Sequence, residues 1–591
     1  TSRESFAINL SGGTSNYRRI TADGNMPITD TIGFRINLMA HQNDAVGRDV
    51  VHSSRWGVAP SITIGMGTDT SFTAIFLHQD EDRVPDYGVP IALTASATDI
   101  ELPVTEYGVG RSAFYGFAGS DADHSLVNTL TLLFDHRASD TLSFNSDTKL
   151  GAYSRYFRQA VASCAAATCG AQLLDGVAGT VPVASVAQRG AYDQLTRGIQ
   201  NVSSMILTAP VGGLRNEFAI GWDISYQTND RTQYANGAAV NKDLFNPANS
   251  GAAILPTTLD NVRDTTGTDV ALFIEDRLWM LPTLSVNLGL RYQHYVNEQD
   301  QLSYGATLCN GVTQAAGLCA QTMRSSNNLW SPKAAIIWEP SNAVSAYLSY
   351  SRALVPPGNA VGNGDALSAL TASSSITRSD LPPERTTTYD AGVKIGLFGQ
   401  RVLVQSSIYQ IDRANATEVD PTTNFVQYSP EPAQRLRGFE LGVSGGITPQ
   451  LRLSANYAYI DSENISAYTG STGTSAVVVN TAALGKQVRY VPKHAASLWA
   501  AYNAGETGPI PGLEIGGGLT HQSRVYLNSE NTQAAPGYVV YDAMIAYNIG
   551  GTRIALNGYN LTNRLYYSQV NGSRVVPGAG RSLVASVNFA F

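Results

Sequence analysis

The last ten residues of the chain, SLVASVNFAF (582–591), alternate between two kinds of side chain. Every second residue from Leu583 to Phe591 is apolar. The positions between them include Ser582, Ser586 and Asn588. Because successive side chains of an extended chain point to opposite faces, this pattern predicts a β-strand with one apolar face. The strand ends on an aromatic residue and not in a polar tail.

The same alternation recurs along the chain. It is clear in TLSVNLGLRYQHY (283–295), LRLSANYAY (451–459) and VVYDAMIAYNI (539–549), where the second face carries mostly Ser, Asn, Gly, Arg, Asp or Gln. No apolar run approaches the ~18 residues that a membrane-spanning helix needs. The sequence therefore predicts an all-β protein whose strands have one apolar and one polar face.

Composition points to a membrane interface. Charged residues are 15% of the 591 residues, against ~25% in ordinary soluble proteins. Tyr outnumbers Phe by 29 to 17, which suits a boundary where one end of the ring is apolar and the other is wet. The net charge is −8 and no basic stripe is present, so nucleic acid is not expected as a partner.

Breaks between the alternating segments are of two kinds. Short turns are expected at 66–71, 137–140, 280–283, 339–343, 397–400, 446–450 and 548–552. Long connections rich in Gly, Ser, Asn and Pro are expected at about 80–124, 155–195, 228–265, 297–325, 352–384, 413–433, 463–491, 524–537 and 562–580. Because every second connection of a meander lies at the same end, one end of the sheet should carry tight turns and the other large loops.

This asymmetry is typical of a transmembrane antiparallel β-barrel with short periplasmic turns and long extracellular loops. Lipid offers no hydrogen bonds to an unpaired strand edge, so the sheet must close into a ring. Counting alternating segments gives about 22 strands, a size at which known barrels are plugged transporters. The last strand should pair with a first strand near residues 5–13. A soluble propeller is the alternative, but its ~40–50-residue repeat is absent.

The four cysteines form two local pairs, Cys164 with Cys169 and Cys309 with Cys319. We expect two disulfide-closed loops and an oxidising compartment. A four-cysteine zinc site is the alternative, although the spacings do not match common zinc patterns. No nucleophile elbow or metal-ligand spacing is visible, so neither an enzyme nor a metal site is predicted.

Several segments resemble the TonB-dependent receptors, and within them the ferric-siderophore receptors. The segment VGRDVVHSSRWGVAPSITIGMGTDT (46–70) is similar to the catecholate branch. The others are ERTTTYDAGVKIGLFGQRVLVQSSIYQIDRANA (384–416), RLRGFELGVSGGITPQLRLSANYAYIDSE (435–463), VPKHAASLWAAY (491–502), IALNGYNLTNRLYY (554–567) and PGAGRSLVASVNFAF (577–591).

The resemblance implies a receptor in the cell outer membrane that takes up a ferric siderophore, of catecholate type, by TonB-dependent active transport. Iron would be carried as part of the substrate, and no bound cofactor is implied. The implied partners are the ferric siderophore, TonB, outer-membrane lipid, lipopolysaccharide and the barrel assembly machinery. Phe591 resembles the terminal aromatic residue that this machinery reads.

The chain departs from the family pattern at its start. Family members carry an N-terminal plug domain, preceded by a segment that engages TonB. Residues 1–591 are expected to form only the barrel, with the plug domain absent from this chain and TonB reached through that missing segment. The alternatives are a natural passive pore without a plug, a TonB-dependent carbohydrate or other nutrient transporter, and a scaffold in a larger outer-membrane assembly.

A ferric catecholate is anionic and has flat rings, so its site should combine guanidinium groups with aromatic planes. Such residues should lie in long loops or at the upper lumen wall. The candidate binding residues are Arg83, Tyr87, Arg111, Tyr115, Arg324, Trp330, Tyr428 and Arg435.

Each candidate has an alternative as an ordinary loop or lumen residue. Arg489 and Tyr490 adjoin a family-like strand start and are read as structural. His494 is also read as structural, with a lumen site for iron as its alternative. The acidic run at 80–82 is read as a solvated loop face, and a divalent-cation site is the alternative.

Overall fold

The structure is a computed structural model. It describes residues 3–591 except 95–98, 175–181, 189–190, 250–257, 310–311, 360, 362–380, 420–425, 430–432, 472–476 and 507. Within strands, the side chains of 188, 305–309, 312–316, 417–419, 426–428, 468–471, 477–478 and 480 are also not described.

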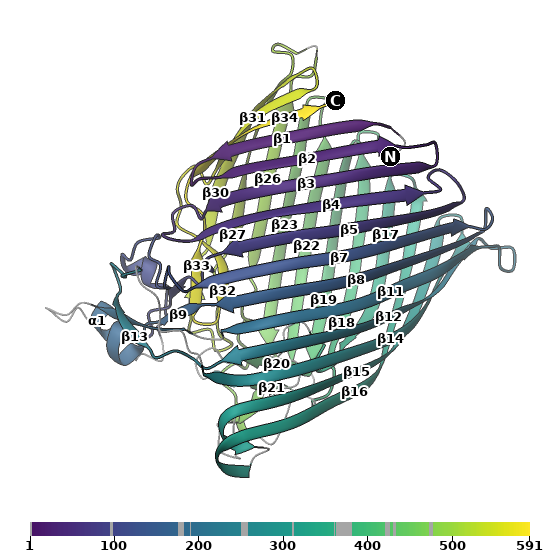
Figure 1. Cartoon of the computed structure of the whole chain (residues 1–591). Helices are drawn as coiled ribbons and strands as arrows, with labels where there is room; N and C mark the ends of the chain where they lie inside the picture. The colour runs from purple at the N-terminus through teal and green to yellow at the C-terminus, as the bar shows by residue number, and fades with distance from the viewer. Residues whose placement is uncertain are drawn as a thin grey trace.

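Twenty-two antiparallel strands form one closed barrel (Figure 1). Each pairs with its neighbours in chain order, and β1 also pairs with β34, which closes the ring. The predicted strand number and closure are confirmed. The barrel strands are β1 (Ser5–Gly13), β2 (Arg18–Pro27), β3 (Ile32–Asp44), β4 (His52–Ile64), β5 (Thr70–Arg83), β7 (Ala122–Arg137), β8 (Leu142–Arg158), β11 (Tyr192–Thr208), β12 (Asn216–Tyr234), β14 (Leu259–Leu281), β15 (Leu284–Cys309), β16 (Val312–Ser341), β17 (Val344–Val355), β18 (Glu384–Leu397), β19 (Val402–Ala414), β22 (Gln434–Gly446), β23 (Leu451–Asn464), β26 (His494–Asn503), β27 (Leu513–Gln522), β30 (Tyr538–Ile549), β31 (Thr552–Tyr559) and β34 (Ser582–Ala590).

The alternation of side chains separates an apolar outer face from a polar inner face. Outer residues such as Leu272, Leu288 and Ile408 are more than half exposed, as expected of side chains that face lipid. The inner face carries ion pairs, including Arg291 with Asp223 at 3.0 Å. In the described part of the chain, no helix is long and apolar enough to cross a membrane.

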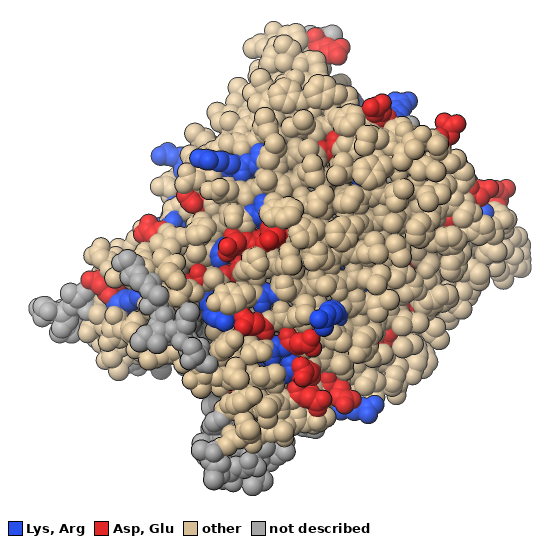
Figure 2. All heavy atoms as spheres, in the orientation of Figure 1, with Lys and Arg blue, Asp and Glu red and all other residues tan. Residues whose placement is uncertain are grey.

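Charged side chains follow the same division. Figure 2 shows them gathered over the loop-side part of the strands in view, with a few more at the opposite rim. Between these two zones lies a broad area with very few charged atoms. An outer band with few charges is expected where the barrel contacts the hydrocarbon layer of the membrane.

The two ends of the barrel differ, as the sequence predicts (Figure 1). All seven predicted turns join consecutive barrel strands at one end, which we call the turn end. Three further turns at this end, 28–31, 209–215 and 504–512, were not predicted. The other end, the loop end, carries most of the long connections. Its first two connections, 14–17 and 45–51, are nevertheless short.

One predicted long connection is wrong. Residues 297–325 were expected to form an irregular loop, but β15 extends to Cys309 and β16 begins at Val312, and the two strands pair antiparallel on both sides of residues 310–311. The alternation is weak here because both faces carry polar residues. Strand residues that extend beyond the bilayer do not need an apolar outer face.

Additional short elements occupy the connections at the loop end. They are β6 (Val89–Pro90), β9 (Ala160–Ser163), β10 (Val183–Gln188), β13 (Val240–Asp243), β20 (Ala416–Val419), β21 (Val426–Ser429), β24 (Tyr468–Ser471), β25 (Val477–Asn480), β28 (Val525–Tyr526), β29 (Ala534–Ala535), β32 (Tyr567–Asn571) and β33 (Arg574–Pro577), with a 3-10 turn at Val104–Tyr107, a π turn at Ala166–Gly170 and α1 (Ala171–Leu174).

These connections pack together around an apolar core of their own, which we call the loop core. It brings residues from five connections into contact, including Ile91, Val186, Leu244, Leu527 and Val575, each at most 1% exposed. Burial on this scale fixes the connections relative to one another. The loop end is therefore an ordered layer over the barrel mouth.

A buried carboxyl group lies within this layer. Asp121 is 4% exposed, and its Oδ2 accepts hydrogen bonds from the backbone N–H groups of Phe117 at 3.1 Å and Ala160 at 3.2 Å. Lys242 is also buried and donates to the carbonyl oxygen of Gly116 at 2.7 Å. Burial raises the pKa of Asp121 from 3.8 to about 6, although the two backbone donors and Lys242 lower it.

The raised pKa predicts how the stability of the loop layer depends on pH. The folded state binds a proton more tightly than the unfolded state, so stability is highest below about pH 4, falls as pH rises to about 6, and is flat above. The change from Asp121 is on the order of 3 kcal/mol. Hydrogen exchange of the β9 and β10 amides should show faster opening at pH 7 than at pH 4.5. In Asp121→Asn this difference should shrink, and an unchanged difference would assign it to another group.

The seam between β1 and β34 has seven residue pairs, from Ala7 with Ala590 to Gly13 with Val584. Val587 pairs with Leu10, whose side chain is exposed on the outer face, so the predicted lipid face of the last strand is confirmed. Beyond the strand, the N–H of Phe591 donates to the carbonyl oxygen of Phe6 at 2.9 Å, and the N–H of Phe6 donates back at 3.3 Å.

Deleting Phe591 should reduce the amount of folded barrel in the membrane. The deletion removes two backbone hydrogen bonds at the seam, worth about 1 kcal/mol each, together with the terminal ring. The measurement is the heat-modifiable, folded fraction in isolated outer membranes. Phe591→Trp keeps both bonds and an aromatic end and serves as the control. Equal folded fractions for the deletion and the parent would remove this role from Phe591.

Candidate functional site

The connection between β5 and β7 reaches over the barrel mouth and is held by a buried ion pair. Arg48 donates to both carboxylate oxygens of Asp86, at 2.7 and 2.9 Å. Asp86 also accepts from the N–H of Gly88. Gly88 has a φ of 76°, and a Cβ there would collide with the carbonyl oxygen of Val575. These constraints fix Tyr87, which lies between Asp86 and Gly88.

Beneath this connection, two arginines share one carboxylate on the inner wall. Asp123 of β7 is 2% exposed. It accepts from Nε of Arg83 in β5 at 2.7 Å, and from Nε and Nη2 of Arg155 in β8 at 2.7 and 2.8 Å. We call these three residues the arginine clamp. Its charges sum to one net positive charge.

Aromatic rings surround the clamp. Phe157 is the register partner of Asp123, and Tyr192 of β11 is the partner of Phe157. The guanidinium carbon of Arg155 lies 4.4 Å from the centroid of the Phe157 ring, within cation–π range. The ring of Phe157 lies 5.1 Å from that of Tyr192 and 6.1 Å from that of Tyr87.

The hydroxyl group of Tyr87 is a hydrogen-bond donor at neutral pH. Burial raises the pKa of Tyr87, which therefore stays protonated. The hydroxyl of Tyr192 accepts from Nη1 of Arg155 at 2.9 Å. A further guanidinium, that of Arg231 in β12, lies 3.9 Å from the Tyr192 ring centroid. Cationic and aromatic groups thus alternate across β5, β8, β11 and β12.

The arginine clamp, Tyr87 and Phe157 line a cavity of about 420 Å³ at the loop end. Residues of β32 and β33 also contribute to its lining. The cavity is open to solvent and could accept a planar anionic group. The lining residues used below are Arg83, Tyr87, Asp123, Arg155 and Phe157.

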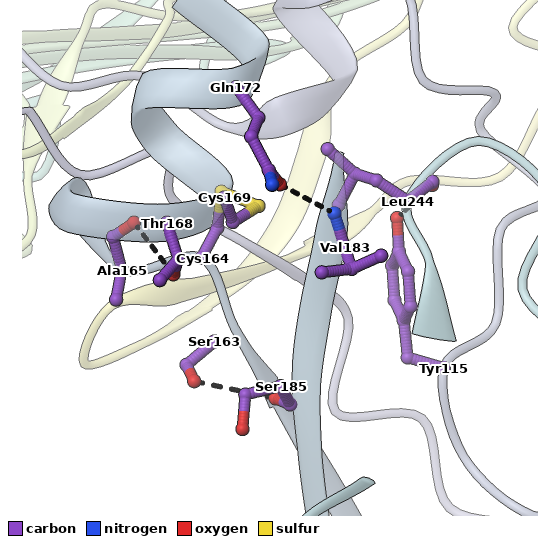
Figure 3. The surroundings of a disulfide bond; sticks show 10 residues. All are labelled: Tyr115, Ser163, Cys164, Ala165, Thr168, Cys169, Gln172, Val183, Ser185 and Leu244. Atoms are coloured by element: carbon purple, nitrogen blue, oxygen red, sulfur yellow. Dashed lines mark hydrogen bonds between the residues drawn. A yellow bond between two sulfur atoms is a disulfide. The ribbon is translucent and has the colours of Figure 1, made fainter. Parts of the chain in front are cut away.

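Two of the predicted binding residues, Arg83 and Tyr87, are thus brought together, but two others belong to the loop layer. Tyr115 is 2% exposed, and its hydroxyl donates to the carbonyl oxygen of Leu244 at 2.6 Å, as Figure 3 shows. Arg111 donates to the side-chain and backbone oxygens of Asn563, at 2.8 and 3.2 Å. Both residues hold connections together.

Three of the remaining predicted residues lie away from the cavity. Trp330 is 53% exposed on the outer face of β16, in contact with the ring of Tyr292. Arg324 has the same strand parity as Trp330 and also faces outward. Arg435 faces outward with Phe439 and donates to Asp412 at 2.6 Å. The side chain of Tyr428, in β21, lies outside the described residues.

Sequence reasoning missed Arg155 and Phe157 because it assigned 155–195 to a loop. The signal was present in SRYFRQ (154–159), where alternation continues β8 and places Arg155 and Phe157 on the inner face. An outward neighbour, Tyr156, is 40% exposed. Following the alternation three residues further, to Phe157, would have found the pair.

The disulfide predicted between Cys164 and Cys169 is present and buried beside the loop core (Figure 3). Next to it, Oε1 of Gln172 accepts from the N–H of Val183 at 3.3 Å. Cys319 is also disulfide-bonded, and the side chain of its predicted partner, Cys309, lies outside the described residues. The bridge at Cys164 joins the π turn to β9 and so stiffens the layer over the cavity.

The acidic run at 80–82 does not converge on one point. Asp80 and Asp82 face outward, whereas Glu81 faces inward, 3.9 Å from Arg55. Among the described residues, no group of three or more His, Cys, Asp and Glu side chains is arranged to hold a metal ion. His494 pairs in register with Tyr459 and contacts the hydroxyl of Tyr457 at 2.9 Å, which fits its structural reading.

Comparison with known proteins identifies the family. Residues 57–561 match the model described as "TonB dependent receptor-like, beta-barrel". The chain is 26% identical to the "Probable TonB-dependent siderophore receptor PiuA" of Acinetobacter baumannii, over 98% of this chain and 76% of the relative. It is 27% identical to the "Catecholate siderophore receptor Fiu" of Escherichia coli K12, over 98% of this chain and 75% of the relative.

Solved structures agree with this assignment at the level of the fold. The crystal structure of PiuA from Acinetobacter baumannii covers 100% of this chain with a TM-score of 0.84, at 23% identity and over 82% of that chain. The closed form of Fiu from Escherichia coli K12 covers 100% of this chain with a TM-score of 0.81, also at 23% identity and over 82% of that chain. The protein is an outer-membrane β-barrel that belongs to the TonB-dependent receptor family.

Proposed function

We propose that this receptor takes up a ferric siderophore of catecholate type from outside the cell by TonB-dependent transport. The observation that carries the proposal is the arginine clamp, flanked by Tyr87 and Phe157, in a cavity at the loop end. The printed names of the relatives PiuA and Fiu describe siderophore receptors and support the same substrate class.

The chemistry of the cavity matches a ferric catecholate. The complex is anionic, and its oxygen atoms can accept the forked N–H groups of a guanidinium. Its flat rings can stack on Phe157 and Tyr87, and stacking between rings adds to the area that is buried. Iron enters as part of the substrate, held by the siderophore's own oxygens.

Several partners follow from the family and stay predictions. TonB would be engaged through a plug and a preceding segment, using energy from the inner membrane. Arg83, Tyr87, Arg155 and Phe157 would form the first contact of the ligand on its way to that plug. Lipopolysaccharide and the barrel assembly machinery are expected contacts of the outer wall and of Phe591.

A carbohydrate transporter is the second candidate, since aromatic rings and polar groups also bind sugars. The two arginines on one carboxylate favour an anion over a neutral sugar, because the net positive charge would be left without a partner. The receptor should bind a ferric catecholate and not a neutral oligosaccharide, measured side by side by calorimetry. Preference for the oligosaccharide would reverse the assignment. Large ungated conductance of the complete protein in planar bilayers would instead favour the passive pore.

Alanine at Arg83 or Arg155 should weaken binding of the ferric catecholate by about 10–100-fold. One charge-assisted hydrogen bond is worth about 1.5–3 kcal/mol, and 1.4 kcal/mol is tenfold in affinity. The expected order is a larger loss for Arg155→Ala, because Arg155 also contacts the Phe157 ring and donates to the Tyr192 hydroxyl. Ligand-induced fluorescence quenching of the purified receptor gives the affinities.

Arg324→Ala is the matched control. It removes the same functional group, but from the outer face of β16, and should leave affinity unchanged. If Arg324→Ala weakens binding as much as Arg83→Ala, the ligand contacts the extended β15–β16 hairpin and the cavity assignment is wrong. Unchanged affinity in both clamp variants would have the same consequence.

A further inference from the structure

The inner wall carries a second group of cationic side chains, on the strands between the candidate cavity and the seam. One row of register partners crosses these strands from β1 to β5 and contains Ser11, Arg19, His41, Arg55 and Glu81. The next residue on β2, Ile20, is exposed on the outer face. Because side chains alternate along a strand, the residues of this row face the lumen.

The guanidinium group of Arg19 has no partner in the part of the chain that the structure describes. Arg19 is half-buried, and no described residue forms a hydrogen bond or an ion pair with its side chain. The row continues towards the seam with two small residues, Ser11 and Ser586, which leave space beside the guanidinium. A half-buried charge without a partner is unfavourable, and an anionic ligand would remove that cost.

Arg55, two strands further along the row, is only weakly neutralised. Its Nη1 lies 3.9 Å from Oε1 of Glu81, which is close to the limit for an ion pair. That carboxylate oxygen also accepts from the Ser53 hydroxyl at 3.3 Å. The Arg55 side chain is 35% exposed, and among the described residues none accepts a hydrogen bond from its guanidinium. Its terminal nitrogens are therefore available to a ligand.

Aromatic rings accompany these arginines, as they do at the clamp. Tyr17 lies just before β2, and its ring meets the ring of His41 edge-on, with centroids 5.1 Å apart. His41 is 9% exposed, and its Nε2 contacts Oδ1 of Asn43 at 2.9 Å. These contacts hold the two rings beside Arg19 and Arg55. The wall thus repeats the combination of two guanidinium groups with aromatic planes.

This second group adjoins the candidate cavity. Asn43 and Ser53 line the cavity and are register partners, and His41 and Arg55 lie two residues nearer the turn end on the same two strands. Ser53 is also the register partner of Arg83. Arg55 is therefore a diagonal neighbour of Arg83, about 7–8 Å away. A ligand seated in the cavity can reach both groups of arginines without leaving the wall.

We propose that Arg19 and Arg55, with Tyr17 beside them, form a second anion subsite that contacts the same ferric siderophore as the arginine clamp. The inference rests on the proposed function and extends it, because the ligand must then carry more than one catecholate ring. One ring lies at the clamp, and the oxygens of another accept the forked N–H groups of the second pair. In the register row His41, and no carboxylate, lies between Arg19 and Arg55, so these oxygens displace no resident anion.

Arg19→Gln in the complete receptor should weaken binding of a ferric tris-catecholate by about tenfold, as expected for the loss of one charge-assisted contact. Arg55→Gln should act in the same direction. Ligand-induced fluorescence quenching gives the affinities. Arg18→Gln is the matched control, because Arg18 adjoins Arg19 in β2 and carries the same charge but is exposed on the outer face. It should bind the ligand as the wild type does.

Salt dependence separates a ligand contact from a structural role of Arg19. Raising sodium chloride from about 50 to about 500 mM should weaken binding, because salt screens charges, and it should weaken binding less in Arg19→Gln than in Arg18→Gln. Heat-modifiable migration of each variant confirms that the barrel is folded.

The outcomes keep this inference apart from the proposed function. Wild-type affinity in Arg19→Gln and Arg55→Gln, or equal losses in Arg18→Gln and Arg19→Gln, would overturn the second subsite. So would equal salt dependence in Arg18→Gln and Arg19→Gln. If Arg83→Ala still weakens binding in any of these cases, the proposed function stands without the second subsite. Unchanged affinity in the clamp variants as well would reject both.

Discussion

The pairing of backbone hydrogen bonds in a medium without water is the constraint on which this structure depends. Each strand edge inside lipid must meet another, so β34 pairs with β1 and closes the ring. The seven-residue seam, the apolar outer face and the alternation of turns and loops follow from it. Once the ring has closed at 22 strands, its lumen is too wide for its own side chains to fill. Polar ion pairs can then line the inner wall, and the connections at the loop end are left to cover the mouth.

The packed connections at the loop end supply part of the candidate binding surface. Connections far apart in sequence, such as those carrying Ile91, Leu244 and Val575, share one buried core. Their rigidity places Tyr87 above Arg83 and Arg155. The clamp itself comes from the barrel, because Arg83, Asp123 and Arg155 are strand residues just below the loops. The candidate site therefore combines side chains of the barrel wall with side chains of the packed loop layer.

The barrel could be predicted from sequence because lipid imposes a strict period of two. Alternation in 582–591 and 283–295 indicated the correct faces, and the pairing of the last strand with the first was predicted correctly.

The same rule fails for strand residues outside the bilayer. At 297–325 both faces are wet, so nothing in the sequence distinguishes strand from loop, and Arg324 was assigned to a loop although it lies in β16. Arg155 was missed for a different reason, because the alternation that continues through 154–159 was not followed into the predicted loop, whereas Arg83 and Tyr87 were named because they combine a guanidinium and an aromatic ring in one loop. Tyr115 and Arg111 have that chemistry too, but their partners, Leu244 and Asn563, are distant in sequence and could not be foreseen. The separation of the complete protein into barrel and plug stays a prediction.

Asp123 has a consequence for selectivity. The Asp123 carboxylate already accepts hydrogen bonds from Arg83 and Arg155, so an anionic group is part of the cavity itself. A simple ion such as chloride gains little there, because the arginines it would approach are already engaged. Only a ligand with several oxygens and a ring to bury can compete, since it adds contacts with Phe157 and Tyr87 that Asp123 does not supply. When that ligand leaves, Asp123 again accepts hydrogen bonds from both arginines. Because Asp123 competes for the two arginines, the receptor would bind simple anions of the medium weakly and could still release its substrate.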